Sequence, residues 1–132
     1  MRIGLLASIL VAAAVLAQGA ASAPAAAVDL RVTVWSEGRQ GQPRTWTLRC
    51  GPMSGTHPAR ARACRMLART GQPFRPVPKD MLCTQVFGGP DEALITGTFR
   101  GRRIWARFNL RDGCQIARWR RLAPLLPPAG TA

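Results

Sequence analysis

Residues 48–64 read LRCGPMSGTHPARARAC and contain the strongest structural signals of the chain. The alternating pattern before them predicts a β-strand that ends at Cys50, and the glycines and prolines that follow predict a turn. Residues 57–68 are mostly good helix formers, so a helix is expected to carry Cys64 close to its buried face. A disulfide from Cys50 could therefore tie a sheet to this helix.

Alternating apolar and polar residues predict four β-strands, arranged as two hairpins. The first hairpin is expected from residues 29–35 and 45–50, with glycines and a proline in the turn between them. The second is expected from residues 92–98 and 104–110, on either side of the turn signal Arg100-Gly101-Arg102.

Two helices are predicted, one after each hairpin. Thr56 is in position to cap the first helix, in which Ala63, Met66 and Leu67 have the i, i+3, i+4 spacing of one buried face. Asp112 is expected to cap a second, short helix. The order strand, strand, helix, strand, strand, helix predicts an α+β fold, in which both helices pack on one face of an antiparallel sheet.

The N-terminus has the features of an export signal. Arg2 supplies a positive charge, residues 3–17 are apolar, and small residues follow. We expect residues 1–27 to be a signal peptide, because this apolar core is shorter than the roughly 20 residues that span a bilayer. A single small domain over residues 28–122 and a flexible C-terminal tail over residues 123–132 are expected to follow. The protein is therefore predicted to be secreted and extracellular, without stable membrane insertion.

The four cysteines agree with export, because an even number in a small exported protein is typical of a disulfide framework. They lack the C-x-x-C spacing of zinc and thioredoxin sites, and the chain has no glycine-rich phosphate loop. His57 is the only histidine, the six carboxylates are scattered, and tyrosine is absent. We therefore predict a protein that is not an enzyme and needs no metal or cofactor, with His57 in a capping or packing role.

The formal net charge of +13 comes almost wholly from arginine, and Lys79 is the only lysine. Such a charge favours polyanions or acidic surfaces as partners. The arginines are nevertheless spread along the chain, without the aromatic-interleaved spacing of nucleic-acid-binding modules. A solvated basic surface is therefore the preferred interpretation, and no specific nucleic acid is expected as a partner.

Three motifs resemble the subtilisin inhibitor-like family, whose members are secreted bacterial inhibitors of serine proteases. The first, within residues 48–64, is similar to the family pattern L-x-C…P…G-T-H-P…A-C. The second, residues 81–87 (MLCTQVF), looks like the family's reactive loop, in which a cysteine lies three residues before a Val-Tyr or Val-Phe pair. The third runs from Gly97 through residues 101–104 to Cys114. Together these motifs extend over most of the chain after the signal segment.

The resemblance implies a five-stranded antiparallel sheet with two helices, and a homodimer. It also implies two disulfides, Cys50–Cys64 and Cys83–Cys114. The implied partner is an extracellular serine protease of the subtilisin class, which would be inhibited by a substrate-like reactive loop.

Carried over to this chain, the resemblance places the scissile-type bond between Gln85 and Val86. The remaining loop contacts are Leu82, Cys83 and Thr84 before the bond and Phe87 after it.

Three parts of the loop depart from the common family pattern. Thr84 stands where proline is common, and Gln85 stands where methionine, lysine or leucine is usual. Gly88-Gly89 adds flexibility where the family usually has a stiffer Asp-Pro. We therefore keep one alternative, a basic secreted binding module on the same fold that binds polyanions or acidic surfaces and has lost inhibition. Binding that weakens steeply between about 50 and 200 mM salt would distinguish that module from an inhibitor.

Overall fold

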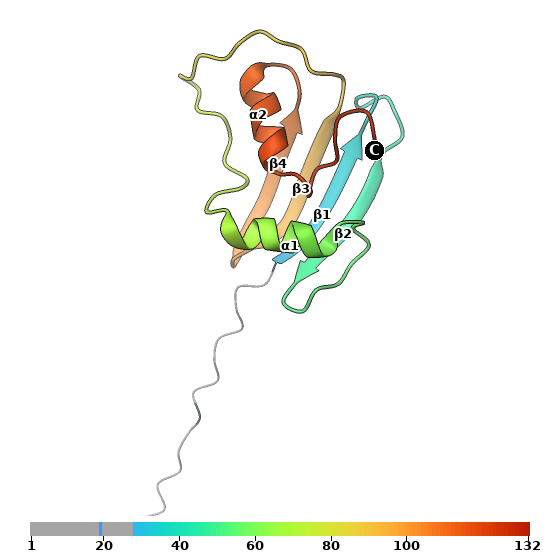
Figure 1. The fold of residues 1–132 in the computed structure, drawn as a ribbon, viewed down its shortest axis with the longest axis vertical. Coiled ribbons are helices and arrows are strands. Elements are labelled where there is room, and N and C mark those ends of the chain that lie inside the picture. The colour runs from blue at the N-terminus through green and yellow to red at the C-terminus, as the bar shows by residue number, and fades with distance from the viewer. Residues whose placement is uncertain (1–18, 20–27) are drawn as a thin grey trace, which may run out of the picture.

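Both helices lie on one face of a four-stranded antiparallel sheet in the computed structural model of the chain (Figure 1). The structure describes Gly19 and residues 28–132, so the predicted signal peptide, residues 1–27, lies outside the described residues except for Gly19. No helix in this described part is long and apolar enough to cross a membrane. The elements are β1 (Val28–Trp35), β2 (Arg44–Cys50), α1 (Arg60–Arg69), β3 (Glu92–Phe99), β4 (Arg102–Asn109) and α2 (Gly113–Arg121).

Both predicted hairpins are present, and β1 joins them in the strand order β2-β1-β3-β4. The alternation in β1 works as expected, since Leu30 and Val32 are buried while Arg31 is exposed on the opposite face. In the register of the sheet, Val32 lies opposite Trp46 of β2 and Ile95 of β3. The apolar rows of the strands therefore meet the helices, and the core lies between the two layers.

Helix α1 packs on the sheet through the face that the sequence predicts. Ala63 and Leu67 are buried, and Met66 is half-buried against the core. The disulfide Cys50–Cys64 joins the end of β2 to this helix, with the two Cα atoms 5.8 Å apart. This pairing confirms the one that the family resemblance implies.

The sheet has four strands within residues 28–132, so the five-stranded sheet implied by the resemblance is not formed there. The segment after α2 is unsuited to add a further strand. Pro124, Pro127 and Pro128 have no N–H to donate to a strand ladder, and they interrupt any strand. The chain turns there instead, and the Leu125 N–H donates to the Leu122 carbonyl at 2.6 Å.

The same segment contributes to the core, although the sequence predicts a flexible tail over residues 123–132. Leu125 and Leu126 are buried. The indole N–H of Trp119 donates to the Pro127 carbonyl at 2.8 Å, which fixes the segment against α2. Two adjacent leucines between prolines have neither helix nor strand periodicity, so the pattern of the sequence does not reveal their burial.

The start of α1 differs from the prediction that Thr56 caps it. The helix begins at Arg60 without a side-chain cap. Thr56 bonds to β2 instead, because its Oγ1 accepts from the Thr47 N–H at 3.0 Å and its own N–H donates to Thr47 Oγ1 at 3.2 Å. The predicted cap of α2 is confirmed, since Asp112 Oδ1 accepts from the Gln115 N–H at 2.9 Å.

Candidate functional site

Residues 81–89, called the exposed loop below, cross one end of the molecule as an extended segment that belongs to no strand (Figure 1). Its apolar side chains face solvent: Leu82 is 98% exposed, Phe87 69% and Val86 56%. Apolar side chains gathered in this way on the surface indicate contact with another molecule. The sequence-predicted reactive site therefore lies on an accessible part of the structure.

The exposed loop is held to α2 on the N-terminal side of Gln85. The disulfide Cys83–Cys114 is formed as the family resemblance implies, with its Cα atoms 5.4 Å apart. Beside it, the Gly113 N–H donates to the Thr84 carbonyl at 2.8 Å. A Cβ at Gly113 would overlap with Thr84 Oγ1, so a larger residue at this position would force the Thr84 hydroxyl to move.

A second contact holds the exposed loop on the C-terminal side of Val86. The Gly88 N–H donates to the Leu110 carbonyl at 2.7 Å. A Cβ at Gly88 would lie 2.8 Å from Ile116 Cδ1, so the loop backbone rests directly on α2. An apolar hollow of about 480 Å³ lies beneath Val86, and Leu126 from the C-terminal segment forms part of its wall.

Between these contacts, the backbone groups of Gln85, Val86 and Phe87 have no hydrogen-bond partner among the described residues. The Gln85 side chain folds back along the loop, where its Nε2 donates to the Cys83 carbonyl at 3.2 Å. An extended chain with free N–H and C=O groups can add as a strand to the binding cleft of another protein. The site is thus a short extended segment with unbonded backbone groups, and the chain on each side of it is attached to the rest of the fold.

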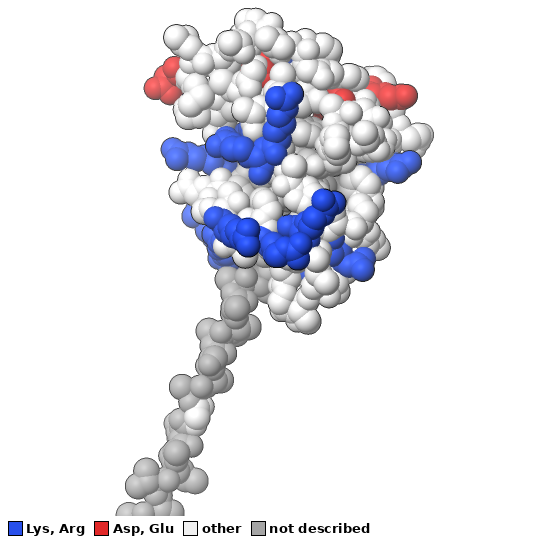
Figure 2. All heavy atoms as spheres, viewed as in Figure 1, with Lys and Arg blue, Asp and Glu red and all other residues white. Residues whose placement is uncertain are grey.

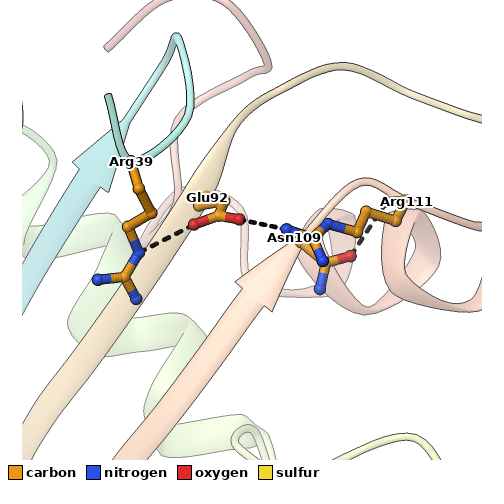
Figure 3. A network of polar contacts seen from close by, with 4 residues as sticks. All are labelled: Arg39, Glu92, Asn109 and Arg111. Atoms are coloured by element: carbon orange, nitrogen blue, oxygen red, sulfur yellow. Dashed lines mark hydrogen bonds and ion pairs between the residues drawn. The ribbon is translucent and has the colours of Figure 1, made fainter. Parts of the chain in front are cut away.

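An ion-pair network supports the strand end next to Leu110 (Figure 3). Glu92 accepts from Arg39 Nε at 2.9 Å through one carboxylate oxygen and from Arg111 Nη2 at 2.7 Å through the other. Asn109 Oδ1 also accepts from the Arg111 N–H at 3.0 Å. The network joins the β1–β2 turn to the ends of β3 and β4, beside the carbonyl that anchors the exposed loop.

A buried guanidinium fixes the chain that leads into the exposed loop. Arg118 is 5% exposed, its Nε donates to the Arg75 carbonyl at 2.8 Å, and its Nη2 donates to the Phe74 carbonyl at 3.2 Å. Nη1 donates to the Arg107 carbonyl of β4, and the guanidinium carbon lies 3.8 Å from the ring centroid of Phe108. Burial lowers the pKa of Arg118, but an arginine stays charged at any ordinary pH.

The sequence identifies the residues of the exposed loop but not those that support it. No local pattern marks the supporting residues, because each contacts a partner far along the chain; they are Gly113, Leu110, Glu92 and Arg118. The partners of Arg118 in the segment before the loop, for example, lie 43 and 44 residues away. A glycine directly after the helix cap Asp112 is the one local signal that could have marked such a close approach.

His57 belongs to the framework and not to the exposed loop. Its Nε2 bonds to the Leu125 carbonyl at 2.9 Å, and its Nδ1 accepts from the Ala59 N–H at 3.1 Å, which requires a neutral ring with the proton on Nε2. Burial lowers the pKa of His57, the hydrogen bond to the Leu125 carbonyl partly opposes this shift, and the positive charge of Arg60 adds to it. These contacts support the packing role that the sequence predicts.

The family model described as subtilisin inhibitor-like matches residues 23–109. No curated protein sequence matches the chain. A chain in the crystal structure of Streptomyces caespitosus sermetstatin in complex with Bacillus licheniformis subtilisin is similar, with 23% sequence identity, a TM-score of 0.45, and coverage of 69% of this chain and 89% of that chain. Because the family match spans most of the sequence, the chain belongs to the subtilisin inhibitor-like family.

Proposed function

We propose that the chain is a secreted inhibitor of subtilisin-like serine proteases, with Gln85–Val86 as its substrate-like bond. The observation that carries the proposal is the pair of tethers around this bond. The disulfide Cys83–Cys114 lies on one side and the backbone hydrogen bond of Gly88 on the other. Membership of the subtilisin inhibitor-like family supports the class of target.

The tethers would act both before and after cleavage. The loop is already extended, so docking it as an antiparallel strand in the protease cleft costs little conformational entropy. Attack on the Gln85 carbonyl carbon would form an acyl-enzyme and free the amine of Val86. Because both new ends stay attached to the scaffold, that amine remains beside the acyl carbon and re-forms the bond. The protease would therefore stay occupied.

The side chains of the exposed loop suggest what the target prefers. Gln85 would enter the primary specificity pocket of the protease. Its side chain must first break its hydrogen bond to the Cys83 carbonyl, which is worth on the order of 1 kcal/mol. Leu82 points fully into solvent and would suit a hydrophobic subsite. Thr84 would contribute contacts before the bond, and Phe87 would lie beyond it.

We favour protease inhibition over the alternative function, in which the chain is a basic binding module that no longer inhibits proteases. Loss of inhibition would remove the need for a rigid loop, yet the tethers at Cys83, Gly113 and Gly88 are all in place. An extracellular location is part of the same proposal, because two disulfides persist in oxidising surroundings.

Titration of the mature protein against subtilisin tests the proposal. We expect residual protease activity to fall linearly to a stoichiometric end point. The matched control is Cys83→Ser/Cys114→Ser, which removes one tether and should convert the inhibitor into a substrate that is cut and released. Full protease activity in a large molar excess of the native chain, with Gln85–Val86 simply cleaved, would contradict the proposal.

A further inference from the structure

A basic hollow of about 590 Å³ lies between the segment that follows α1 and the β3–β4 turn. Its floor contains Phe74 and Phe99, whose rings meet edge to face with centroids 5.3 Å apart. We call it the arginine hollow, because its charged lining residues are Arg75, Arg100, Arg102 and Arg103.

The walls of the arginine hollow are fixed by hydrogen bonds. Arg100 donates through Nη2 to the Leu67 carbonyl at 3.0 Å and through Nη1 to the Gly71 carbonyl at 3.3 Å, so it holds the end of α1. The buried Arg118 holds the opposite wall through the carbonyls of Phe74 and Arg75. The hollow is therefore a built feature and not a gap between mobile side chains.

No carboxylate neutralises the arginine hollow within residues 28–132. None of its lining residues is acidic, and the three ion pairs in this part of the chain involve other arginines, namely Arg39, Arg49 and Arg111. Figure 2 shows basic side chains over α1 and across the middle of the visible face, while acidic side chains lie toward the end that carries the exposed loop. The hollow is thus part of a positively charged end of the molecule.

The chemistry of the lining points to an oxyanion ligand. Guanidinium groups bind phosphate oxygens through paired N–H···O bonds with fixed geometry. The rings of Phe74 and Phe99 are only 9% and 6% exposed, so they offer no face on which a nucleic-acid base could stack. We propose that the arginine hollow binds a linear, phosphate-rich polymer without bases, and that Arg75, Arg102 and Arg103 contact successive phosphates while Arg100 holds the wall.

Most of the arginine hollow lies at the opposite end of β3 from the exposed loop, and of its arginines only Arg75 also lines a second hollow beside Leu82 and Cys83. β3 runs from Glu92, beside the loop anchor, to Phe99 in the floor of the hollow, and eight residues of strand span about 25 Å. A polymer bound in the hollow would leave the loop free. The protein would then be retained on a phosphate-rich surface with its exposed loop directed away from that surface.

Fluorescence anisotropy with labelled inorganic polyphosphate tests the proposal on the mature protein. We expect the affinity to fall steeply between about 50 and 200 mM salt. Arg102→Ala/Arg103→Ala should weaken binding roughly tenfold or more at the lower salt concentration, because it removes two phosphate contacts. The matched control is Arg31→Ala/Arg44→Ala, which removes the same charge from exposed residues outside the hollow and should weaken binding less than about twofold.

Two outcomes would overturn the proposal. Equal losses in the two double variants would mean that net charge, and not the hollow, binds the polymer. Duplex DNA that competes as well as polyphosphate at equal phosphate concentration would contradict a ligand without bases. Thermal melting confirms that each variant is folded, and the measurement uses no protease, so its result is independent of whether the chain inhibits one.

Discussion

Among single residues, Gly113 shows how little space separates the exposed loop from α2. Its N–H holds the Thr84 carbonyl, and any Cβ at this position would overlap with the Thr84 hydroxyl. We expect Gly113→Ala to displace the loop and to weaken inhibition of subtilisin by roughly 5- to 150-fold, because overpacking of this kind costs roughly 1–3 kcal/mol. Inhibition constants of the native and variant proteins measure the effect.

A second substitution makes this prediction specific. Thr84→Ala removes the hydroxyl that would clash, while the Thr84 Cβ lies at a tolerable 3.4 Å from a Cβ at residue 113. We expect Thr84→Ala alone to change the inhibition constant little, and Gly113→Ala/Thr84→Ala to recover most of the lost affinity. If the double variant were as weak as Gly113→Ala, the steric explanation would be wrong.

His57 gives the stability of the protein a defined pH dependence. Burial lowers its pKa in the folded state, so the unfolded chain takes up the proton at a higher pH than the folded chain does. The free energy of unfolding should be highest above the ordinary histidine pKa of about 6.5 and should fall as the pH drops from there toward the lower folded pKa.

Urea denaturation at a series of pH values between about 8 and about 5 measures this dependence. His57 is the only histidine of the chain, so His57→Gln should be less stable at pH 8 but should lose most of the slope below about pH 6.5. A variant with the slope of the native protein would show that another group is responsible.

At the level of elements, Arg118 connects α2 to β4 and to the segment that leads into the exposed loop. Arg118→Leu would leave three carbonyl groups without their donor. We expect the free energy of unfolding to fall by about 2–4 kcal/mol, measured by urea denaturation. Arg120→Leu is the matched control on the same helix, because Arg120 is exposed and should change stability by less than about 0.5 kcal/mol. Similar effects of the two substitutions would contradict this role.

The elements that could be predicted from the sequence are those with a local signature. The strands alternate, and Asp112 caps a helix that begins at the next residue. Thr56 is different, because it bonds to Thr47 across a turn and leaves the helix start uncapped. His57 and Leu125 are bonded across 68 residues, so no periodicity could have placed the C-terminal segment in the core.

The candidate site also has one part with a local sequence signature and one part without. The exposed loop could be found from residues 81–87, since their composition and their cysteine resemble a known reactive loop. Its support could not, because the contacts of Gly113 and Gly88 depend on how closely α2 approaches the loop backbone. The distance between α2 and the loop backbone is set only when the elements pack together, so it leaves no pattern in the sequence.

For the whole molecule, the outer face of the sheet, opposite the two helices, presents exposed apolar side chains among the described residues. Trp105 on this face is 63% exposed, and Leu94 and Trp35 on the same face are half-buried. The guanidinium carbon of Arg107 lies 4.5 Å from the ring centroid of Trp105 and covers only part of it. Apolar side chains on an otherwise polar sheet face indicate an interface with another protein.

The family resemblance implies a homodimer, and we expect two copies to meet through this face by twofold symmetry. Trp105→Lys would remove its largest apolar side chain, so the dimer dissociation constant should rise at least about tenfold. Analytical ultracentrifugation over a concentration series measures the change.

Phe87→Lys is the matched control, because it makes the same kind of change at a similarly exposed aromatic residue on the exposed loop. It should leave the dimer intact while it affects inhibition. Trp105→Lys should weaken the dimer and leave inhibition unchanged. The reason is that the loop is anchored to α2 and to Leu110, and not to the outer face of the sheet. A native chain that is monomeric at every concentration, or a dimer lost equally in both variants, would contradict this interface.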